Sequence, residues 1–206
     1  MLRLTAALSL LLGLTLLLDY LSLVGRTPWT SVPRRHLRAM KDRLVAPRSF
    51  ATYTVRDFER LPHFESLERY APLEQRGVTL EGYVQRTIIA SDGDVHLEVA
   101  PTRRIAGGPD TTYVTAEVTP RWRQGSRWSY GHLVAALRPN DGGVTPWFEG
   151  PRRVRISGWL LYDRYDQVPS QWARAHGARL TGWEVHPVTA IAMWDDSLRS
   201  FVELPR

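Results

Sequence analysis

The residues VTLEGYVQRTIIASDGDVHLEVAP (78–101) carry the clearest structural signal in this chain. In the second half, Val95, Leu97 and Val99 alternate with polar residues, and a period of two is typical of a strand with one buried face. Between the halves lies Asp92-Gly93, a dipeptide that tolerates the positive φ of a tight hairpin turn. This stretch therefore predicts two antiparallel strands, Val78–Ile89 and Asp94–Pro101, joined by a hairpin.

Three further strands are predicted along the chain. They are Tyr113–Thr119, Val154–Tyr162 and Trp183–Trp194. The first and fourth strands each contain a glycine, Gly82 and Gly158, where a barrel strand can coil sharply because no Cβ is present. A long insert, residues 121–151, follows the third strand and includes a predicted helix, Trp128–Leu137. This order predicts a mainly β fold, a five-stranded OB-fold-like Greek-key barrel at residues 77–194.

An apolar segment precedes the barrel. Leu4–Val24 is 21 residues long with one formal charge, Asp19, and as a helix rising about 1.5 Å per residue it matches a hydrocarbon core about 30 Å thick. Residues 1–25 are therefore predicted to be an uncleaved transmembrane signal-anchor or a cleaved signal peptide. Leu23, two residues before Gly25, suits signal peptidase poorly, which favours the anchor. We expect a membrane-anchored or exported protein, with the side of the membrane left open.

Residues 26–76 are interpreted as a connector outside the barrel. Prolines interrupt it at positions 28, 33, 47, 62 and 72, so only short helices fit, and we expect them at Pro33–Val45 and Val55–Tyr70. No strand pattern is visible here. The second helix has an apolar side that is expected to pack on the barrel. The residues of this side are Phe58, Leu61, Phe64, Leu67 and Tyr70. Residues 195–206 are expected to form a C-terminal tail.

The net charge of +6 is concentrated in the connector. Residues 26–48 contain seven basic residues and one acid, whereas 19 basic residues balance 19 acidic ones from Ser49 to Arg206. A neutral barrel lacks the general positive field that draws proteins to nucleic acids. Because the basic run follows the predicted membrane segment, one interpretation is contact with anionic lipid headgroups; the other is a solvated spacer helix. The residues proposed for lipid contact are Arg34, Arg35, Arg38, Lys41 and Arg43.

The absence of cysteine removes several classes of function. With no cysteine in 206 residues, disulfides, thiolate zinc sites, iron–sulfur clusters and cysteine nucleophiles are excluded. The sequence also contains no P-loop, G-x-G-x-x-G fingerprint or H-E-x-x-H pair. Catalysis therefore has no support from a sequence motif, and no cofactor is expected.

Several motifs together resemble a known group of proteins. SDGDVHLEV (91–99), YVTAEV (113–118), VRISGWLLYD (154–163) and WEVHPVTAI (183–191) are similar to segments of uncharacterised, mostly exported bacterial proteins described as OB-fold-like. The resemblance covers about residues 77–193 and implies a fold and exported relatives, but no substrate and no catalytic residue. Thermonuclease-like enzymes, which are also OB barrels, share the D-G-D turn, but no arginine follows it here until Arg103.

Titratable residues gather on the polar side of the predicted sheet. In OB order the third strand lies between the second and the fifth, so His96, Glu117 and His186 are expected to be neighbours on one face. Two histidines and a carboxylate are the ligands of many zinc and iron sites. The alternative is a set of cross-strand pairs on the outer barrel surface. The whole polar face comprises Asp94, His96, Glu117, Glu184 and His186. For Asp94, we expect bonds to the turn amides.

A second cluster combines aromatic and basic residues after the third strand. OB grooves bind single strands or sugars by stacking them on aromatic side chains beside arginines. The candidate ligand-binding residues are Arg121, Trp122, Arg123, Arg127, Trp128 and Tyr130. The alternative interpretation is a loop that is tucked against the barrel.

Three functions follow from these patterns. The preferred one is a membrane-tethered or exported binding or scaffolding module, with a protein, a glycan or a nucleic-acid strand as partner. The second is a metal-dependent hydrolase or nuclease-like enzyme that uses His96, Glu117 and His186. The third is a protein that binds single-stranded nucleic acid.

Overall fold

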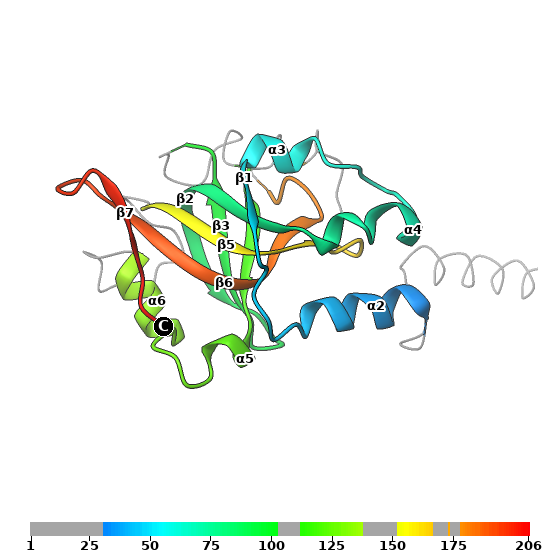
Figure 1. Cartoon of the computed structure of the whole chain (residues 1–206), viewed down its shortest axis with the longest axis horizontal. Helices are drawn as coiled ribbons and strands as arrows, with labels where there is room; N and C mark the ends of the chain where they lie inside the picture. Colours follow the sequence, from blue (N-terminus) through cyan, green and yellow to red (C-terminus); the bar gives the residue numbers. More distant parts are fainter. Residues whose placement is uncertain (1–30, 103–111, 138–151, 167–172, 174–177) are drawn as a thin grey trace, which may run out of the picture. The chain divides into compact units, whose positions relative to one another are not determined.

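The computed structural model describes residues 31–102, 112–137, 152–166, 173 and 178–206. The chain divides into two compact units, residues 1–38 and residues 39–206. Residues 31–38 are the described part of the first unit. They contain most of helix α2, Val32–Lys41, whose last three residues belong to the second unit. The described strands all lie in the second unit (Figure 1).

Seven strands form one sheet that closes on itself. They are β1 Phe50–Thr54, β2 Gly77–Ile89, β3 Val95–Ala100, β4 Val114–Val118, β5 Arg153–Tyr162, β6 Trp183–Asp195 and β7 Ser200–Glu203. Their order is β1-β2-β3-β4-β6-β5, β7 pairs with β6, and β2 also pairs with β5. The five strands β2, β3, β4, β6 and β5 therefore make a closed ring. The predicted mainly β fold with a five-stranded barrel is confirmed.

The pairing directions follow from the connections along the chain. β2 and β3 are antiparallel and joined by the predicted hairpin, and β3–β4, β5–β6 and β2–β5 are antiparallel as well. β4 and β6 instead run in parallel, through the pair Ala116 and Val185. A parallel pair needs a long connection, and the residues between β4 and β6, which include all of β5, provide it.

The barrel interior is filled by every second residue of the strands. Val95, Leu97 and Val99 of β3 are fully buried, as are Val114, Ala116 and Val118 of β4. The alternation that predicted these strands thus marks the core-facing positions. Trp128 and Trp183 are the largest of the fully buried side chains and belong to the same hydrophobic core.

Two glycines lie where strands approach each other too closely for a side chain. A Cβ on Gly158 would lie 2.3 Å from the backbone oxygen of Pro187, and one on Gly82 would lie 2.7 Å from the backbone oxygen of Ala100. The pairing of β5 with β6 is irregular on both sides of Gly158. Both strands therefore require glycine for close backbone approach, as expected for the sharp coiling of a small barrel.

The connector contains a strand that its sequence did not indicate. β1 pairs with β2 in parallel, from Phe50 opposite Gly77 to Thr54 opposite Glu81. Most side chains of β1 are exposed, so its residues show no alternation of buried and polar positions. The expectation that the connector has no strand is therefore wrong. The C-terminal tail also contains a strand, β7, which pairs with β6.

The single helix expected at Val55–Tyr70 is broken into shorter pieces. These pieces are α3 Val55–Glu59, α4 Leu67–Tyr70 and a 3-10 turn, η1, at Leu73–Gln75. Pro62 removes a backbone donor and ends the helical path. Phe64 has a positive φ of 57° and is 70% exposed, so it does not pack on the barrel as predicted. Phe58 and Tyr70 do lie in the core.

Two short helices follow β4. α5 comprises Pro120–Arg123, with Thr119 as its N-cap, and α6 comprises Tyr130–Leu137, close to the helix predicted at Trp128–Leu137. Within the described ranges, we find no helix that is both long enough and apolar enough to span a bilayer. The predicted membrane segment, Leu4–Val24, lies outside those ranges and stays a prediction.

Candidate functional site

The polar sides of β3, β4 and β6 meet on the outer face of the barrel. Across β3 and β4, His96 lies opposite Glu117. Since β6 runs beside β4 and its inward positions belong to the core, Glu184 and His186 project from the outer face next to Glu117. Asp94 lies at the start of β3, directly after the hairpin turn.

His186 is surrounded by three carboxylates. Its Nδ1 atom lies 2.7 Å from Glu117 Oε2 and 3.1 Å from Glu184 Oε1, while its Nε2 atom lies 3.6 Å from Asp94 Oδ2. On the neighbouring strand, His96 Nε2 lies 3.3 Å from Glu117 Oε1. The structure thus brings together all five residues of the polar face.

Four of the five residues of this outer face are buried, and His96 is partly buried. Glu184 and His186 have no exposed area, Glu117 is 2% exposed and Asp94 is 6% exposed. The pairs are therefore not surface ion pairs, which contribute little to stability. They are charges in a medium of low dielectric constant, where each partner is needed to offset the desolvation of the other.

Further charged residues, absent from the prediction, complete the site. Lys41, at the end of α2, places its Nζ 3.1 Å from Asp163 Oδ2 and 3.8 Å from Glu117 Oε2. Arg179 donates to Glu184, and its Nη1 atom lies 2.6 Å from Asp166 Oδ2. We use the term charged cluster for the buried set and the two cations that reach it. Its members are Asp94, His96, Glu117, Asp163, Glu184, His186, Lys41 and Arg179.

The surroundings shift the pKa values of three members in different directions. Burial would lower the pKa of His186, but Glu117 and Glu184 outweigh it and raise this pKa to about 9. Burial raises the pKa of Asp94 to about 6, although His186 acts against it. Burial would also raise the pKa of Glu117, yet His186 and Lys41 hold it below its usual value. With no bound ion, His186 is therefore an imidazolium at neutral pH.

The carboxylate of Asp94 does not have the role expected of it. The turn amide, Asp94 N, donates instead to Asp92 Oδ1 at 3.1 Å, so Asp92 stabilises the hairpin. The side chain of Asp94 is left to face His186. One donor atom from each of Asp94, Glu117 and His186 lies within 4.8 Å of the others, and this set can hold either protons or a metal ion.

The aromatic and basic residues after β4 divide into different environments. Trp128 is fully buried, and its Nε1 atom donates to Leu204 O at 3.3 Å. Arg123 donates to Gly93 O in the hairpin, and Tyr130 Oη donates to Thr87 O at 3.3 Å. Arg127 is exposed. For Trp128 the alternative of a loop packed against the barrel describes the structure better than a stacking surface.

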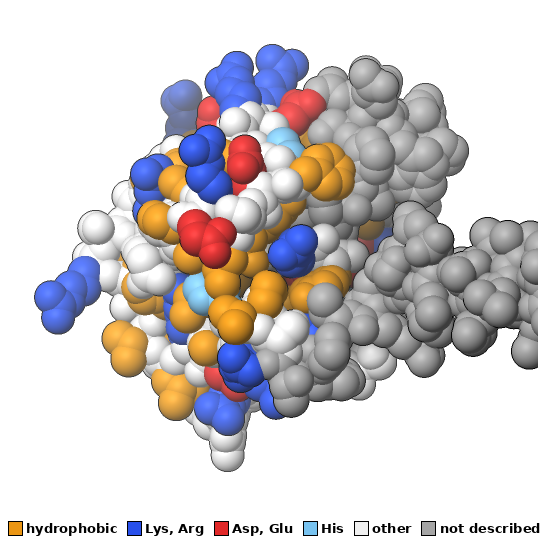
Figure 2. Space-filling view, turned by 90° about the vertical axis from the view of Figure 1, so that its right-hand side faces the viewer, with side chains coloured by type: hydrophobic (Ala, Val, Ile, Leu, Met, Phe, Trp, Pro, Cys, Tyr) orange, Lys and Arg blue, Asp and Glu red, His pale blue; other side chains and the backbone are white. Residues whose placement is uncertain are grey.

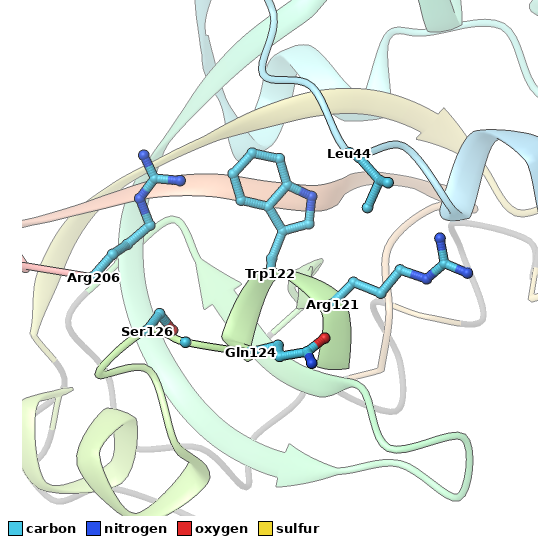
Figure 3. Close-up of a pocket in the computed structure, with 7 residues that line it drawn as sticks. Leu44, Arg121, Trp122, Gln124, Ser126 and Arg206 are labelled. Atoms are coloured by element: carbon cyan, nitrogen blue, oxygen red, sulfur yellow. The ribbon is translucent and has the colours of Figure 1, made fainter.

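Arg121 and Trp122 line an open pocket of about 330 Å³ beside α5. Figure 3 shows the indole of Trp122 between Arg206 on one side and Leu44 and Arg121 on the other. The indole is fixed because its Nε1 atom donates to Arg43 O at 2.9 Å. Arg206 places its guanidinium carbon 5.3 Å from the centre of the Trp122 ring. We call this hollow the Trp122 pocket; Gln124, Gly125 and Ser126 complete its lining.

No family model, curated protein or solved structure matches this chain. Its chemistry is therefore inferred from its own residues. On the face seen in Figure 2, basic and acidic side chains of the described residues are interspersed with hydrophobic ones, as expected for a barrel of balanced charge.

Lys41 and Arg43, which are among the five residues proposed for lipid contact, have partners within the protein. Lys41 belongs to the charged cluster, and Arg43 donates to Glu74 O at 2.7 Å and stacks on Trp159, with 4.4 Å between the guanidinium carbon and the ring centre. Contact of the five residues with anionic headgroups, Arg34, Arg35 and Arg38 included, stays a prediction.

Proposed function

We propose that this protein is a binding module built on an OB-type barrel and held at a membrane by Leu4–Val24. The ring order β2-β3-β4-β6-β5 corresponds to the OB order first, second, third, fifth, fourth, and the parallel β4–β6 pair corresponds to its third and fifth strands. The membrane tether is supported by the length and apolar character of the segment.

The binding site in this proposal is the Trp122 pocket. The proposal depends mainly on the two arginines of this pocket. Within the described part of the chain, Arg121 and Arg206 have no carboxylate partner. They flank an indole that is held in place by its bond to Arg43 O. Two guanidinium groups that no carboxylate of the described residues neutralises, placed around a fixed aromatic ring, favour an anionic ligand that also has a flat face.

The ligand class follows from these groups. A guanidinium binds carboxylate or phosphate with two parallel hydrogen bonds, and an indole offers a stacking surface for a base or a sugar ring. Gln124 and Ser126 add polar atoms to the lining. The shared chemistry is therefore an anionic polymer with stackable units, of which single-stranded nucleic acid and acidic polysaccharide are the two sources.

A second hollow, of about 430 Å³, is a weaker candidate for an anion. It is lined by residues of β1, β2, β5, β6 and β7, including Arg155 and Phe201. There Arg155 Nε lies 3.1 Å from Glu81 Oε2, and its guanidinium carbon lies 4.1 Å from the centre of the Phe201 ring. Arg155 shares Glu81 with Arg153, and the acid Glu203 also lines the hollow, so it attracts an anion less strongly than the Trp122 pocket.

Fluorescence anisotropy tests the proposal with the full chain in detergent micelles and two labelled probes, an oligothymidylate and polygalacturonate. We expect one probe to bind, which identifies the source of the ligand. Trp122→Ala removes the stacking surface, worth about 1–3 kcal/mol per base, and should weaken binding roughly tenfold. Arg121→Ala should also weaken it, whereas Arg127→Ala, an exposed arginine outside the pocket lining, should not.

Two results would contradict the proposal. One is the absence of binding to either probe. The other is equal affinity of Arg121→Ala and Arg127→Ala, because a general electrostatic attraction would not distinguish these two positions.

A further inference from the structure

We propose that Asp94, Glu117 and His186 form a binding site for a divalent transition-metal ion, with Zn²⁺ as the ion that fits best. This site lies in the charged cluster and is separate from the Trp122 pocket. It does not depend on the binding function proposed above.

The spacing of the donor atoms suits a tetrahedral ion. Metal–ligand bonds of about 2.0–2.1 Å to nitrogen and oxygen give ligand–ligand distances of roughly 3.4 Å. His186 Nε2 and Asp94 Oδ2 are 3.6 Å apart, and the donor atoms of Asp94, Glu117 and His186 all lie within 4.8 Å of one another. An ion can therefore be accommodated by small side-chain movements.

An independent observation comes from the hydrogen bonds of His186. Its Nδ1 atom lies 2.7 Å from Glu117 Oε2 and 3.1 Å from Glu184 Oε1, whereas its Nε2 atom is fully buried and has no hydrogen-bond partner. Metal-binding histidines donate one ring N–H to a carboxylate, which leaves the lone pair of the other nitrogen for the metal. Once an incoming metal ion displaces the Nε2 proton, Nε2 and the Asp94 carboxylate are two electron-pair donors facing each other, and the ion between them satisfies both.

The charge balance of the cluster also calls for a cation. Four carboxylates of the cluster are almost fully buried: Asp94, Glu117, Asp163 and Glu184. The permanent cations that reach them are Lys41 and Arg179. When His186 is the neutral imidazole that a metal ion requires, two negative charges are left, and buried charges without partners are costly. One divalent ion matches this deficit.

Lys41 does not occupy the position required by the ion. Its Nζ atom is closer to Asp163 Oδ2, at 3.1 Å, than to Glu117 Oε2, at 3.8 Å. The ammonium group therefore belongs mainly to Asp163. A further nitrogen donor beside the site is His96, whose Nε2 atom lies 3.3 Å from Glu117 Oε1.

The donor types select the class of metal. A histidine nitrogen together with carboxylate oxygens is a common ligand set for Zn²⁺. Mg²⁺ and Ca²⁺ prefer sites made entirely of oxygen ligands, so they should compete poorly here. Ions such as Cu⁺ prefer thiolate ligands, and this chain contains no cysteine to provide one.

The test measures metal binding by the full chain in detergent after treatment with a chelator. We expect about one equivalent of Zn²⁺ to bind and raise the melting temperature, with no comparable effect of Mg²⁺. Co²⁺ in place of Zn²⁺ should give the intense visible absorption of a tetrahedral site. Asp94→Asn and His186→Ala should each weaken Zn²⁺ binding by tenfold or more. His132→Ala, which removes an exposed histidine on α6, should bind like the wild type.

Two outcomes would overturn the proposal. The wild-type chain could bind no stoichiometric Zn²⁺, a result that does not depend on whether any variant folds. Alternatively, Asp94→Asn, a nearly isosteric change at the edge of the cluster, could bind Zn²⁺ as tightly as His132→Ala, which would assign the metal to other surface groups. Neither result affects binding of anionic polymers in the Trp122 pocket.

Discussion

His186 Nδ1 lies 2.7 Å from Glu117 Oε2, and this contact joins two parallel neighbouring strands on the outer side of the barrel. Both residues are almost completely removed from solvent. A buried pair of this kind is not by itself strong evidence of stability, because desolvation offsets the attraction. Removal of one partner, however, leaves the other as an uncompensated buried charge, so loss of a single partner is far more costly than the net value of the pair.

Glu117→Gln should destabilise the metal-free protein by about 3 kcal/mol, because His186 and Lys41 lose a shared carboxylate in a buried setting. Urea unfolding in the presence of a chelator measures this change. The matched control is Glu81→Gln, since Glu81 pairs with the more exposed Arg153 and Arg155. Its cost should stay below about 1 kcal/mol, and equal costs for the two variants would show that the buried pair has no special role.

The stability of the metal-free protein should fall as the pH rises from about 6.5 to 9. The pKa of His186 is raised from 6.5 to about 9 in the folded chain, so its stabilising contribution is complete below 6.5 and is lost as the pH passes through the folded value. The loss amounts to roughly 3 kcal/mol. Melting temperatures across this range measure it. His186→Gln should flatten the profile, and an unchanged profile would assign the titration to another group.

Asp94 contributes in the same direction at lower pH. Its pKa is raised from 3.8 to about 6, so the folded state favours the protonated carboxyl and loses this contribution between these two values as the pH rises. In the wild-type chain, the titration of Asp94 should lower the melting temperature as the pH rises from about 4 to 6. Asp94→Asn should remove this contribution to the plot of melting temperature against pH and leave the contributions of other groups.

Gly158→Ala should destabilise the barrel by about 3 kcal/mol. The new Cβ would lie 2.3 Å from the backbone oxygen of Pro187, and relief of this overlap requires a shift of β5 against β6. Gly131→Ala is the control: no atom lies within 4 Å of its Cβ, and alanine in helix α6 should stabilise by up to about 1 kcal/mol. Opposite signs in urea unfolding are therefore expected.

The membrane tether is tested by alkaline carbonate extraction of membranes that contain the full chain. We expect the intact chain to stay in the pellet. Leu11→Arg with Leu12→Arg should release it, because each charge near the centre of a spanning helix costs about 2.5–3.5 kcal/mol. Thr27→Arg, outside the apolar segment, should not. A soluble chain shortened by about 25 residues would identify a cleaved signal peptide instead.

The barrel could be predicted because each of its strands carries a local signal. Alternation in β3 and β4 marks one buried side, and Gly82 and Gly158 mark close backbone approach. β1 gave no such signal, since most of its side chains are exposed. Trp128 was also misleading, because a tryptophan in a polar loop looks the same in sequence whether it stacks on a ligand or fills the core.

The candidate site was predictable only where strand register determines it. His96 and Glu117 are neighbours across two adjacent strands, a relationship that the strand order gives directly. The burial of this face is a different matter, because it depends on Lys41 and Arg179, which are distant in sequence from His96 and Glu117. Lys41 belongs to a run of basic residues that would also suit a lipid surface. The local sequence therefore could not show whether Lys41 contacts lipid headgroups or pairs with buried carboxylates.

The change of the dissociation constant with salt concentration measures how many charged contacts the Trp122 pocket makes with a bound polymer. For an oligothymidylate, the slope of log Kd against log salt should become shallower by about 0.7 when Arg121 is replaced by alanine, as expected for one lost phosphate contact; for polygalacturonate the same replacement should also reduce the slope. Arg127→Ala should leave the slope unchanged. Equal slopes for wild type, Arg121→Ala and Arg127→Ala would contradict an anion site in this pocket.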